Sequence, residues 1–546
     1  MKTVVIPCAG TGSRLGELTK NYNKAMITLG PKPVISYIIE HFKKEDEIII
    51  LLGYKGDLLK QVITALYPDW NIKFRTVCPF EGEGSGLGYS LSVAMDLLQK
   101  PFIFWPNDTL VDNDFDKLPY DHDWVMLSVE GKDSSAYRHV LLRTTLSGEY
   151  ATLLPKESTG YTNSFPYVGI CYVKDYERFW SMFSKNRELF VNEGEAAGLN
   201  NIPKLFPVEA ENWVDTGDLT QLEKAKEYYS SKMEETILEK PNEAIWFIGD
   251  RVIKFHVDPK FISDRVKRFD TLLDENQKKA RVKMPKLVFY SENVYVYRRE
   301  PGTIASKCIS LGEFEALLNS FFSYELDDSL TDEDKLAIYK DFYKSKTLAR
   351  ILEYKEQNQD VDLECYVNGL FCFPVYGLVR KINWEKIAKN GVFTKHYHGD
   401  FHLENILVQD GSFVLLDWRQ NFGNVLNGEH GDVYYDLAKM WHSLIVNHAM
   451  VKDKLFSIKE ERKSFFTLDI HRTLLDTEME KILLQFIERN FSVPQAKLLT
   501  ALIFINIAAC HIYPYSKFLF YLGKYFLNKV FVQYPELFVL EEKPRS

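Results

Sequence analysis

The segment "TVVIPCAGTGSRLGELTKNYNKAM" spans residues 3–26 and decides the fold of the first part of the chain. Its opening residues are apolar and β-branched, which is typical of a buried strand. Gly10 and Gly12 follow at once, and a glycine-rich loop in this place lets backbone N–H groups approach a phosphate chain. Glycines also mark ordinary tight turns. Arg14 and Lys24 add two cations suited to phosphate oxygens, which favours an anion-binding loop.

Strand and helix patterns alternate outward from this segment. Residues 33–42 and 57–66 carry apolar side chains at helical spacing, whereas "EIIILLGY" (47–54) and "FIFWPND" (102–108) are typical of buried strands. This βαβ alternation predicts an α/β fold with a Rossmann-like sheet, parallel or mixed.

A second pattern begins near residue 242. The segment "AIWFIGDRVIKFHV" (244–257) predicts a hairpin with a Gly-Asp turn, and the chain is mostly helical in pattern from about residue 430. The apolar stretch 498–513 is shorter than a membrane span and predicts a buried core helix. The segment before residue 242 is polar and charged, which is typical of a linker between domains. We therefore predict a domain over residues 1–232, a linker over 233–241, and an α+β domain over 242–546.

Composition and charge restrict the class of protein. The 546 residues are 46% hydrophobic and 26% charged, as in soluble globular proteins of two or three domains. The net charge of −9 and the lack of a basic stripe argue against nucleic acid as the main partner. Seven scattered cysteines predict reduced thiols, and the apolar start is too short for a signal peptide. We expect a cytoplasmic protein without a membrane partner, in an oligomeric state that the sequence leaves open.

The first motif resembles the sugar-phosphate-type nucleotidyltransferases, whose signature is G-x-G-[ST]-R-L, then Thr, then Pro-Lys. The matching residues are Gly10, Gly12, Ser13, Arg14, Leu15, Thr19 and Lys24, while Asn23 replaces the usual proline. The resemblance implies that the loop residues Gly10, Thr11, Gly12 and Ser13, with Arg14, hold a nucleoside triphosphate. It also implies that Lys24 stabilises the reacting α-phosphate.

Two aspartates follow strand-like segments in this domain. Asp108 ends "FIFWPND", and Asp215 lies in "NWVDTGD". Read alone, Asp108 is a turn residue, and Thr216 or Asp218 caps the helix predicted over residues 219–228. The resemblance implies instead that both aspartates hold Mg²⁺ between the triphosphate and its acceptor.

Two further residues of this domain match the family by position. Gly86 lies in "EGEGSGLGYSLSVAM", where the family has its base-reading loop, and Lys156 lies in "LLPKES". The acidic sugar contact that often precedes this lysine is missing. The acceptor can therefore be a hexose phosphate, a polyol phosphate or a phosphocholine-like compound, and CTP is favoured over UTP by resemblance to cytidylyltransferases.

The segment "YHGDFHLENIL" (397–407) holds the second motif. Zinc binding by His396, His398 and His402 would be expected in H-E-x-x-H, which is not the pattern here. Asp400, Asn405 and a later strand-end aspartate, Asp417, have the spacing of kinase chemistry, where one carboxylate orients a hydroxyl while an amide and a second carboxylate hold magnesium.

This motif resembles the aminoglycoside phosphotransferase and choline kinase superfamily, a bilobal protein-kinase-like fold. Its H-G-D-x-x-x-x-N is matched by His398, Gly399, Asp400 and Asn405, its later acid by Asp417, and its structural acids by Asp432 and Asp436. The resemblance implies that Asp400 acts on a small alcohol and that Asn405 and Asp417 hold Mg²⁺.

Two residues before this motif complete the resemblance. Lys254 would grip the ATP phosphates from an early strand, although lone strand lysines are usually solvated, and Glu300 in "YVYRREPG" would lie at the adenine hinge. The acidic partner of Lys254 is left open among Asp264, Asp270 and Glu275.

Together the two resemblances imply a bifunctional, Mg²⁺-dependent enzyme. A kinase would use ATP to phosphorylate a small alcohol or sugar, and a nucleotidyltransferase would couple the phosphomonoester to CTP or UTP. Conjugates of this kind feed surface glycan or polymer synthesis. The alternatives are a sugar kinase joined to a sugar-1-phosphate nucleotidyltransferase, and a nucleotide-sensing protein without turnover.

Overall fold

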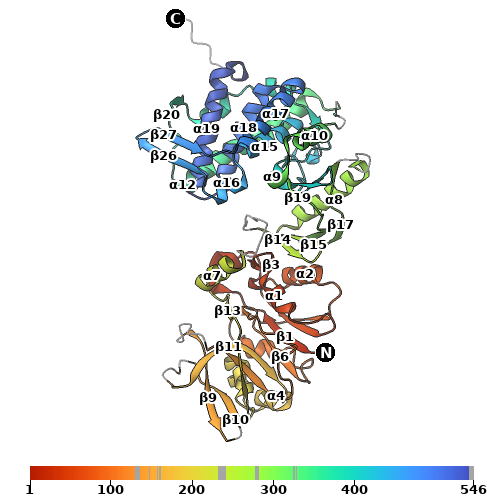
Figure 1. Cartoon of the computed structure of the whole chain (residues 1–546), viewed down its shortest axis with the longest axis vertical. Coiled ribbons are helices and arrows are strands. Elements are labelled where there is room, and N and C mark those ends of the chain that lie inside the picture. The colour runs from red at the N-terminus through yellow and green to blue at the C-terminus, as the bar shows by residue number, and fades with distance from the viewer. Residues whose placement is uncertain are drawn as a thin grey trace. The chain divides into compact units, whose positions relative to one another are not determined.

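A computed structural model describes residues 1–129, 136–146, 148–156, 158, 161–230, 242–276, 282–323, 326–327 and 329–539 (Figure 1). The chain forms two compact units. Unit 1 comprises Met1–Ile262 and Leu287–Arg298, and unit 2 comprises Ser263–Lys286 and Arg299–Ser546. The predicted linker, residues 233–241, lies outside the described residues.

Unit 1 is built on a nine-stranded mixed sheet. Its central strands β5 (Ile72–Thr76), β4 (Glu47–Leu52), β1 (Thr3–Cys8) and β6 (Phe102–Phe104) are parallel and lie in that order. Next to β6 the sheet continues antiparallel with β11 (Ser164–Val173), β9 (His139–Thr145) and β10 (Gly148–Leu153), and β8 (Trp124–Leu127) pairs with β11 and with β12 (Phe206–Glu209). The predicted Rossmann-like mixed sheet is therefore confirmed.

Helices cover this sheet where the apolar spacing predicted them. The segment predicted over residues 57–66 is α2 (Gly56–Leu66), whose Leu59, Val62 and Ile63 are fully buried. The segment 33–42 contains α1 (Val34–Ile39), and the helix predicted over residues 219–228 is α7 (Leu219–Ser230). The other helices are α3 (Leu87–Ser92), α4 (Tyr176–Lys185), α5 (Arg187–Glu193) and α6 (Glu195–Leu199). Short strands β2 (Thr28–Leu29) and β3 (Lys32–Pro33) precede α1.

A second, four-stranded antiparallel sheet also belongs to unit 1. Its order is β14 (Glu243–Ile248), β15 (Arg251–His256), β18 (Val294–Arg298), β17 (Leu287–Tyr290), so the predicted hairpin is confirmed. Trp246 is fully buried and donates its indole N–H to Thr28 Oγ1 at 3.0 Å. Gln61 of α2 accepts at Oε1 from Ser291 Oγ (2.9 Å) and from the backbone N–H of Asn293 (3.0 Å). This sheet therefore shares its core with the nine-stranded sheet.

Unit 2 is mainly helical. In Figure 1 its helices α18 (Val493–Ala508) and α19 (Tyr515–Gln533) appear in dark blue and pack against each other. Helix α18 contains most of the apolar stretch for which a buried helix was predicted, and Leu498, Leu499 and Phe504 are fully buried. In the part of the chain that the structure describes, no helix is long and apolar enough to cross a membrane.

The remaining helices of unit 2 surround the same core. They are most of α8 (Pro259–Asn276), then α9 (Ala305–Cys308), α10 (Leu311–Phe321), α11 (Asp332–Ile338), α12 (Lys346–Asn358), α13 (Val375–Lys381), α14 (Trp384–Lys389), α15 (Val433–Ile445), α16 (His448–Lys452) and α17 (Leu474–Asn490). A π-helical segment, Tyr339–Ser345, joins α11 to α12.

Unit 2 also contains two small sheets and a strand pair. One sheet has the order β16 (Val282–Lys283), β24 (Ser412–Leu415), β23 (Ile406–Gln409), β19 (Thr303–Ile304). The other has the order β21 (Leu370–Cys372), β20 (Cys365–Val367), β27 (Phe465–Ile470), β26 (Phe456–Arg462), and β22 (Phe393–Thr394) pairs with β25 (Gly431–Asp432). The hairpin of β26 and β27 was not predicted in the mostly helical C-terminal part.

Candidate functional sites

The first candidate site lies at the carboxyl end of β1 in unit 1. The loop after β1 turns through Gly12, whose φ of 69° is in the left-handed region that glycine adopts readily. Thr19 Oγ1 donates to the carbonyl of Gly12 at 3.1 Å. A Cβ atom at Gly12 would lie 3.3 Å from Lys24 Cβ, so the loop and Lys24 are direct neighbours.

A small antiparallel pair brings the two predicted metal-binding aspartates together. Strands β7 (Thr109–Leu110) and β13 (Val214–Asp215) pair so that Asp215 lies opposite Thr109. The backbone N–H of Thr216 donates to the carbonyl of Asp108 at 2.8 Å. Asp108 and Asp215, which are 107 residues apart in sequence, are thereby placed side by side.

Three charged side chains converge at Gly217, and a fourth, Lys24, joins them through Asp108. A Cβ atom there would lie 2.9 Å from Asp215 Oδ1, 3.5 Å from Asp108 Oδ2 and 3.6 Å from Arg14 Nη2. Lys24 Nζ forms an ion pair with Asp108 Oδ2 at 2.6 Å. Arg14, Lys24, Asp108 and Asp215 therefore line one small space, and only a residue without a side chain leaves that space open.

The electrostatics of this cluster suit polyphosphate. Burial alone would raise the pKa of Asp108, but the charges of Lys24 and Arg14 hold it below its usual range. Asp215 accepts the Gly217 N–H (2.7 Å) and the Tyr137 hydroxyl (2.7 Å). Two carboxylates next to two cations supply hard oxygen ligands for Mg²⁺ and donors for phosphate oxygens.

The structure also describes the surroundings of the other predicted residues of unit 1. Gly86 precedes α3 with a φ of 155°, and a Cβ there would lie 2.8 Å from the carbonyl of Val191. Lys156 is exposed, and its charge adds to the effect of Arg138, which is the main cause of the lowered pKa of Glu193. Asp218 Oδ1 accepts the N–H of Gln221 at 3.0 Å, so the helix-capping interpretation is confirmed for that aspartate.

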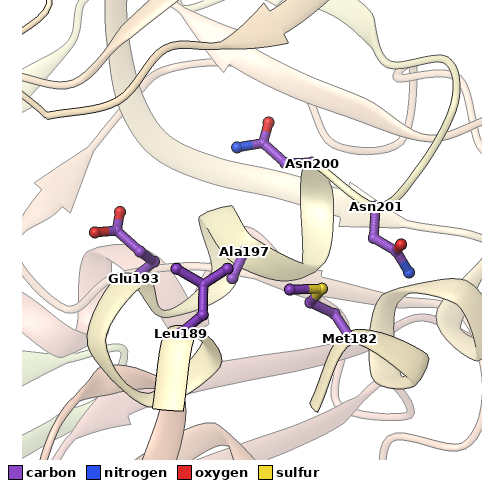
Figure 2. A pocket seen from close by; sticks show the side chains of 6 residues that line it. All are labelled: Met182, Leu189, Glu193, Ala197, Asn200 and Asn201. Atoms are coloured by element: carbon purple, nitrogen blue, oxygen red, sulfur yellow. The ribbon is translucent and has the colours of Figure 1, made fainter. Parts of the chain in front are cut away.

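A pocket on the surface of unit 1 contains none of the predicted site residues (Figure 2). Its volume is about 170 Å³, and helices α4, α5 and α6 with the turn that follows surround it. Its acid, Glu193, already pairs with Arg138. The lining residues are Met182, Leu189, Glu193, Ala197, Asn200 and Asn201.

The second candidate site lies in unit 2, at one end of the hairpin of β23 and β24. Asn405 directly precedes β23, and Asp417 follows β24 closely. The N–H of Leu416 donates to the carbonyl of Asn405 at 2.7 Å. The twelve residues from Asn405 to Asp417 therefore form two short strands and a turn. This hairpin brings Asp417 back close to Asn405. Asp417 has a φ of 57°, a left-handed conformation uncommon outside glycine.

Asp400 is held by three neighbours in this site. Lys439 Nζ pairs with Asp400 Oδ1 at 2.7 Å, and Asn405 Nδ2 donates to Asp400 Oδ2 at 3.2 Å and to its carbonyl at 3.0 Å. His402 Nε2 lies 3.5 Å from Asp400 Oδ2. Burial opposes ionisation, but the Lys439 and His402 charges hold the pKa of Asp400 well below its usual range. Asp400 is therefore an ionised carboxylate whose side chain is still about 37% exposed.

The two histidines of the motif have opposite roles. His398 is fully buried, and burial lowers its pKa to about 3, so the ring is neutral. Its Nδ1 accepts the Asp400 N–H at 3.1 Å and its Nε2 donates to the Leu416 carbonyl at 2.7 Å. Burial also acts against the charge of His402, yet Asp400 and then Glu404 raise its pKa to about 9. His398 thus fixes the loop, and His402 carries a charge.

The acids of the segment "GDVYYDLAK" are buried. Asp436 accepts the backbone N–H groups of His398 (2.8 Å) and Gly399 (2.7 Å), and burial raises its pKa to about 7. Asp432 accepts the hydroxyls of Tyr339 (2.5 Å) and Tyr343 (2.9 Å), and burial raises its pKa to about 6. Both acids therefore hold the backbone and helices around the motif in place.

Not every predicted residue of this site can be placed with it. Lys254 belongs to β15 of unit 1, and Glu300 is a half-buried residue of unit 2 between β18 and β19. Asp264 is described, whereas the side chains of Asp270 and Glu275 lie outside the described part. Among the described residues, no group of three or more His, Cys, Asp and Glu side chains could hold a metal ion by itself.

One comparison with known proteins concerns the N-terminal part of the chain. Residues 3–124 match the family model described as nucleotidyl transferase. The chain thus has an N-terminal nucleotidyl transferase domain. The nucleotidyltransferase resemblance is therefore confirmed for this domain, while the kinase resemblance of the second part stays a prediction.

Two curated relatives are both named as nucleotidyltransferases, but their names give different phosphate substrates and different nucleotides. The chain is 26% identical over 128 residues to the D-glycero-alpha-D-manno-heptose 1-phosphate guanylyltransferase of Campylobacter jejuni, covering 23% of this chain and 56% of that protein. It is 37% identical over 82 residues to the choline-phosphate cytidylyltransferase of Streptococcus pneumoniae, covering 13% and 35% respectively. The chain spans about half or less of the length of these two relatives.

Solved structures of similar proteins cover a larger share of the chain than these two relatives do. The CTP:phosphocholine cytidylyltransferase of Streptococcus pneumoniae is 18% identical with a TM-score of 0.34, covering 42% of this chain and 99% of that one. The inositol-1-phosphate CTP transferase of T. maritima is 15% identical with a TM-score of 0.34, covering 44% and 98%.

Proposed function

We propose that the chain is a bifunctional enzyme that phosphorylates a small alcohol and then couples the phosphomonoester to a nucleoside triphosphate. CTP is favoured over UTP because the resemblance is to cytidylyltransferases, and one relative is named for choline phosphate. The convergence of Arg14, Lys24, Asp108 and Asp215 on the space at Gly217 is the observation that carries this proposal.

In the transferase step, a phosphate oxygen of the phosphomonoester attacks the α-phosphorus of the triphosphate. The bond from the α-phosphorus to the bridging oxygen breaks, and pyrophosphate leaves with the electron pair. Arg14 and Lys24 stabilise the negative charge that develops on the phosphate oxygens, and the loop at Gly10–Ser13 orients the triphosphate. Bound at Asp108 and Asp215, Mg²⁺ would supply further charge neutralisation.

In the kinase step, the hydroxyl oxygen of the acceptor attacks the γ-phosphorus of ATP, and ADP leaves with the bridging oxygen. Asp400 orients the hydroxyl and takes its proton, which then passes to solvent. Its carboxylate is ionised, as this role requires, because Lys439 and His402 lie beside it. Asn405 and Asp417 offer oxygen ligands for Mg²⁺, which would neutralise phosphate charge when bound. Lys254 and Glu300 are assigned to ATP by resemblance alone.

The kinase assignment is supported by the local geometry of the motif. Asp400 and Asn405 are hydrogen-bonded, and the Leu416 N–H joins Asn405 to the residue before Asp417. A solvated loop with a stray His-Gly-Asp would not require a fully buried, neutral His398 that fixes both segments. The arrangement therefore favours a catalytic loop over the plain alternative.

The proposal is tested by following both products with the purified full chain and Mg²⁺. Pyrophosphate release is measured with CTP, UTP, GTP and ATP, each with phosphocholine, glycerol 3-phosphate and glucose 1-phosphate. ADP release is measured with ATP and the matching alcohols. We expect pyrophosphate only when CTP and one phosphomonoester are both present. If nucleotides raise the melting temperature but neither pyrophosphate nor ADP is released, the enzyme proposal is refuted and the nucleotide-sensing alternative takes its place.

A further inference from the structure

Three cationic side chains gather around the ring of Phe342 and the Asp400 carboxylate in unit 2. Lys346 Nζ lies 4.5 Å from the centre of the Phe342 ring, and Arg419 Cζ lies 5.4 Å from it. A Cβ atom at Gly399 would lie 2.5 Å from Arg419 Cβ, so the Arg419 side chain runs directly over the residue before Asp400. Lys439 is the third cation and pairs with Asp400.

Two of these cations, Lys346 and Arg419, form no direct ion pair, although the charge of Asp400 helps to raise the pKa of Arg419. Among the described residues, neither Lys346 Nζ nor the Arg419 guanidinium makes a hydrogen bond or an ion pair, although both side chains are partly buried. Nearby Arg350 has its own carboxylate, Glu353, at 2.6 Å. A guanidinium presents five N–H donors, and leaving them unused in a half-buried place costs free energy unless a ligand or water supplies acceptors.

The carboxylates of this region are already engaged. Asp400 is bridged to Lys439, Asp436 accepts two backbone N–H groups, and Asp341 accepts the N–H of Asn424 at 2.9 Å. None of these three carboxylates forms an ion pair with Lys346 or Arg419. Burial, followed by repulsion from Arg419 and Lys439, lowers the pKa of Lys346 to about 7, which is the behaviour of a cation that lacks a counter-charge.

We propose that the acceptor phosphorylated in unit 2 carries an anionic group, a carboxylate or a phosphate, and that Lys346 and Arg419 bind this group while Asp400 orients the hydroxyl. The inference rests on the kinase function proposed above and narrows its substrate to an anionic alcohol. It disfavours choline and other cationic amino alcohols, which would be repelled by the same two side chains. The ring of Phe342 forms the apolar floor between the two cations.

The test compares alcohols of similar size and different charge. Initial rates of ADP release by the full chain are measured with D-glycerate, glycerol 3-phosphate, glycerol and choline. The first two differ in the anionic group and therefore separate carboxylate from phosphate recognition. We expect at least one of them to have a KM roughly 10-fold or more below that of glycerol, since each charge-assisted bond is worth about that factor. Choline or glycerol as the best acceptor would overturn the proposal.

Variants separate acceptor binding from ATP binding. We expect Lys346→Met and Arg419→Met each to raise the KM of the anionic acceptor about 10- to 100-fold, with the KM of ATP changed less than about 2-fold. The matched control is Lys340→Met. Lys340 is an exposed lysine in the π-helical segment Tyr339–Ser345, and its substitution should leave both KM values unchanged. A larger effect of the two variants on the KM of ATP would show that they bind the nucleotide and would overturn the proposal.

Binding measurements keep the inference testable if no acceptor in the panel turns over. Calorimetric titration of the full chain with inorganic phosphate, in the presence of ADP, is compared between wild type and the Lys346→Met/Arg419→Met double variant. We expect the double variant to lose one phosphate-binding event. Equal titrations of the two proteins would refute the anion site. If ADP does not bind to the wild-type protein, the result instead counts against the kinase function itself.

Discussion

Gly217→Ala is the smallest change that tests the charge cluster of unit 1. It adds one methyl group at the point where Asp215, Asp108 and Arg14 converge. The backbone of Gly217 is not in the left-handed region, so alanine fits the chain conformation without strain. The perturbation is therefore confined to the space that the charged groups share.

The magnitude follows from the contact with Asp215. The new methyl carbon would lie 2.9 Å from Asp215 Oδ1, and ordinary contacts begin near 3.5 Å, so the carboxylate has to move by roughly 0.5 Å. That oxygen accepts the Gly217 N–H at 2.7 Å. Loss of a hydrogen bond to a charged group costs about 1.5–3 kcal/mol. If the transition state loses this much stabilisation, the transferase rate falls about 10- to 150-fold.

The assay is pyrophosphate release by the full chain at saturating CTP and phosphomonoester, with ADP release as the internal standard. We expect a loss of transferase rate in the range above and an unchanged kinase rate. Gly312→Ala is the control, because a Cβ atom there has no neighbour within 4 Å. A transferase rate for Gly217→Ala within 2-fold of wild type, on a folded protein, would refute the assignment of Asp215 to the reacting centre.

Three other predictions concern unit 2. Asp400→Asn should lower the rate of ADP release about 10²- to 10⁴-fold, the usual range for removal of a catalytic carboxylate, measured by steady-state kinetics. His402 has a folded pKa of about 9 against 6.5 in the unfolded chain, so its stabilisation is fully present below pH 6.5 and is lost as the pH rises through 9, by on the order of 3 kcal/mol in chemical denaturation. Lys524→Met leaves Asp362 buried without its 3.0 Å partner and should destabilise the protein by about 3–5 kcal/mol in the same assay.

Each of these predictions has a matched control. Pyrophosphate release should be unchanged in Asp400→Asn, and a parallel loss would indicate misfolding. Other groups titrate in the same range, so the difference between the pH profiles of wild type and His402→Gln isolates the contribution of His402 between pH 6.5 and 9.5. An identical pH profile in the variant would contradict the assignment. Lys481→Met removes an exposed ion pair with Glu478 and should cost less than about 1 kcal/mol. Equal destabilisation by Lys481→Met and Lys524→Met would count against the buried pair.

Local elements of the fold were predictable because their signals are local. The apolar spacing of residues 57–66 predicted α2, and the Gly-Asp turn predicted the hairpin of β14 and β15. The strand within "FIFWPND" was predictable in the same way, but β6 ends at Phe104 and Asp108 lies in the turn before β7, so the prediction that Asp108 ends this strand was wrong. Each of these inferences depends on residues less than about a dozen apart in sequence, where periodicity and turn chemistry are decisive.

Features that depend on distant residues could not be predicted. Lys439 pairs with Asp400 across 39 residues, and no motif around "YDLAK" indicates that partner. Gly217 lies in a turn, where glycine is ordinary, and its contact with Arg14 becomes visible only in three dimensions. Lys346 is one lysine of a charged helix start. The tertiary fold determines the ion pairs and side-chain contacts of both sites. Hydrophobic periodicity predicts local elements and carries no information on these contacts.

The packing of the β14–β15–β18–β17 sheet has a consequence for a chain cut at residues 233–241. Trp246 and Gln61 come from opposite sides of such a cut, yet both contribute to one core with hydrogen bonds to Thr28, Ser291 and Asn293. A nicked molecule would therefore migrate as two fragments under denaturing conditions and as one particle under native conditions. If the two fragments were expressed separately, the indole ring of Trp246 in the C-terminal fragment would lack the N-terminal residues that bury it.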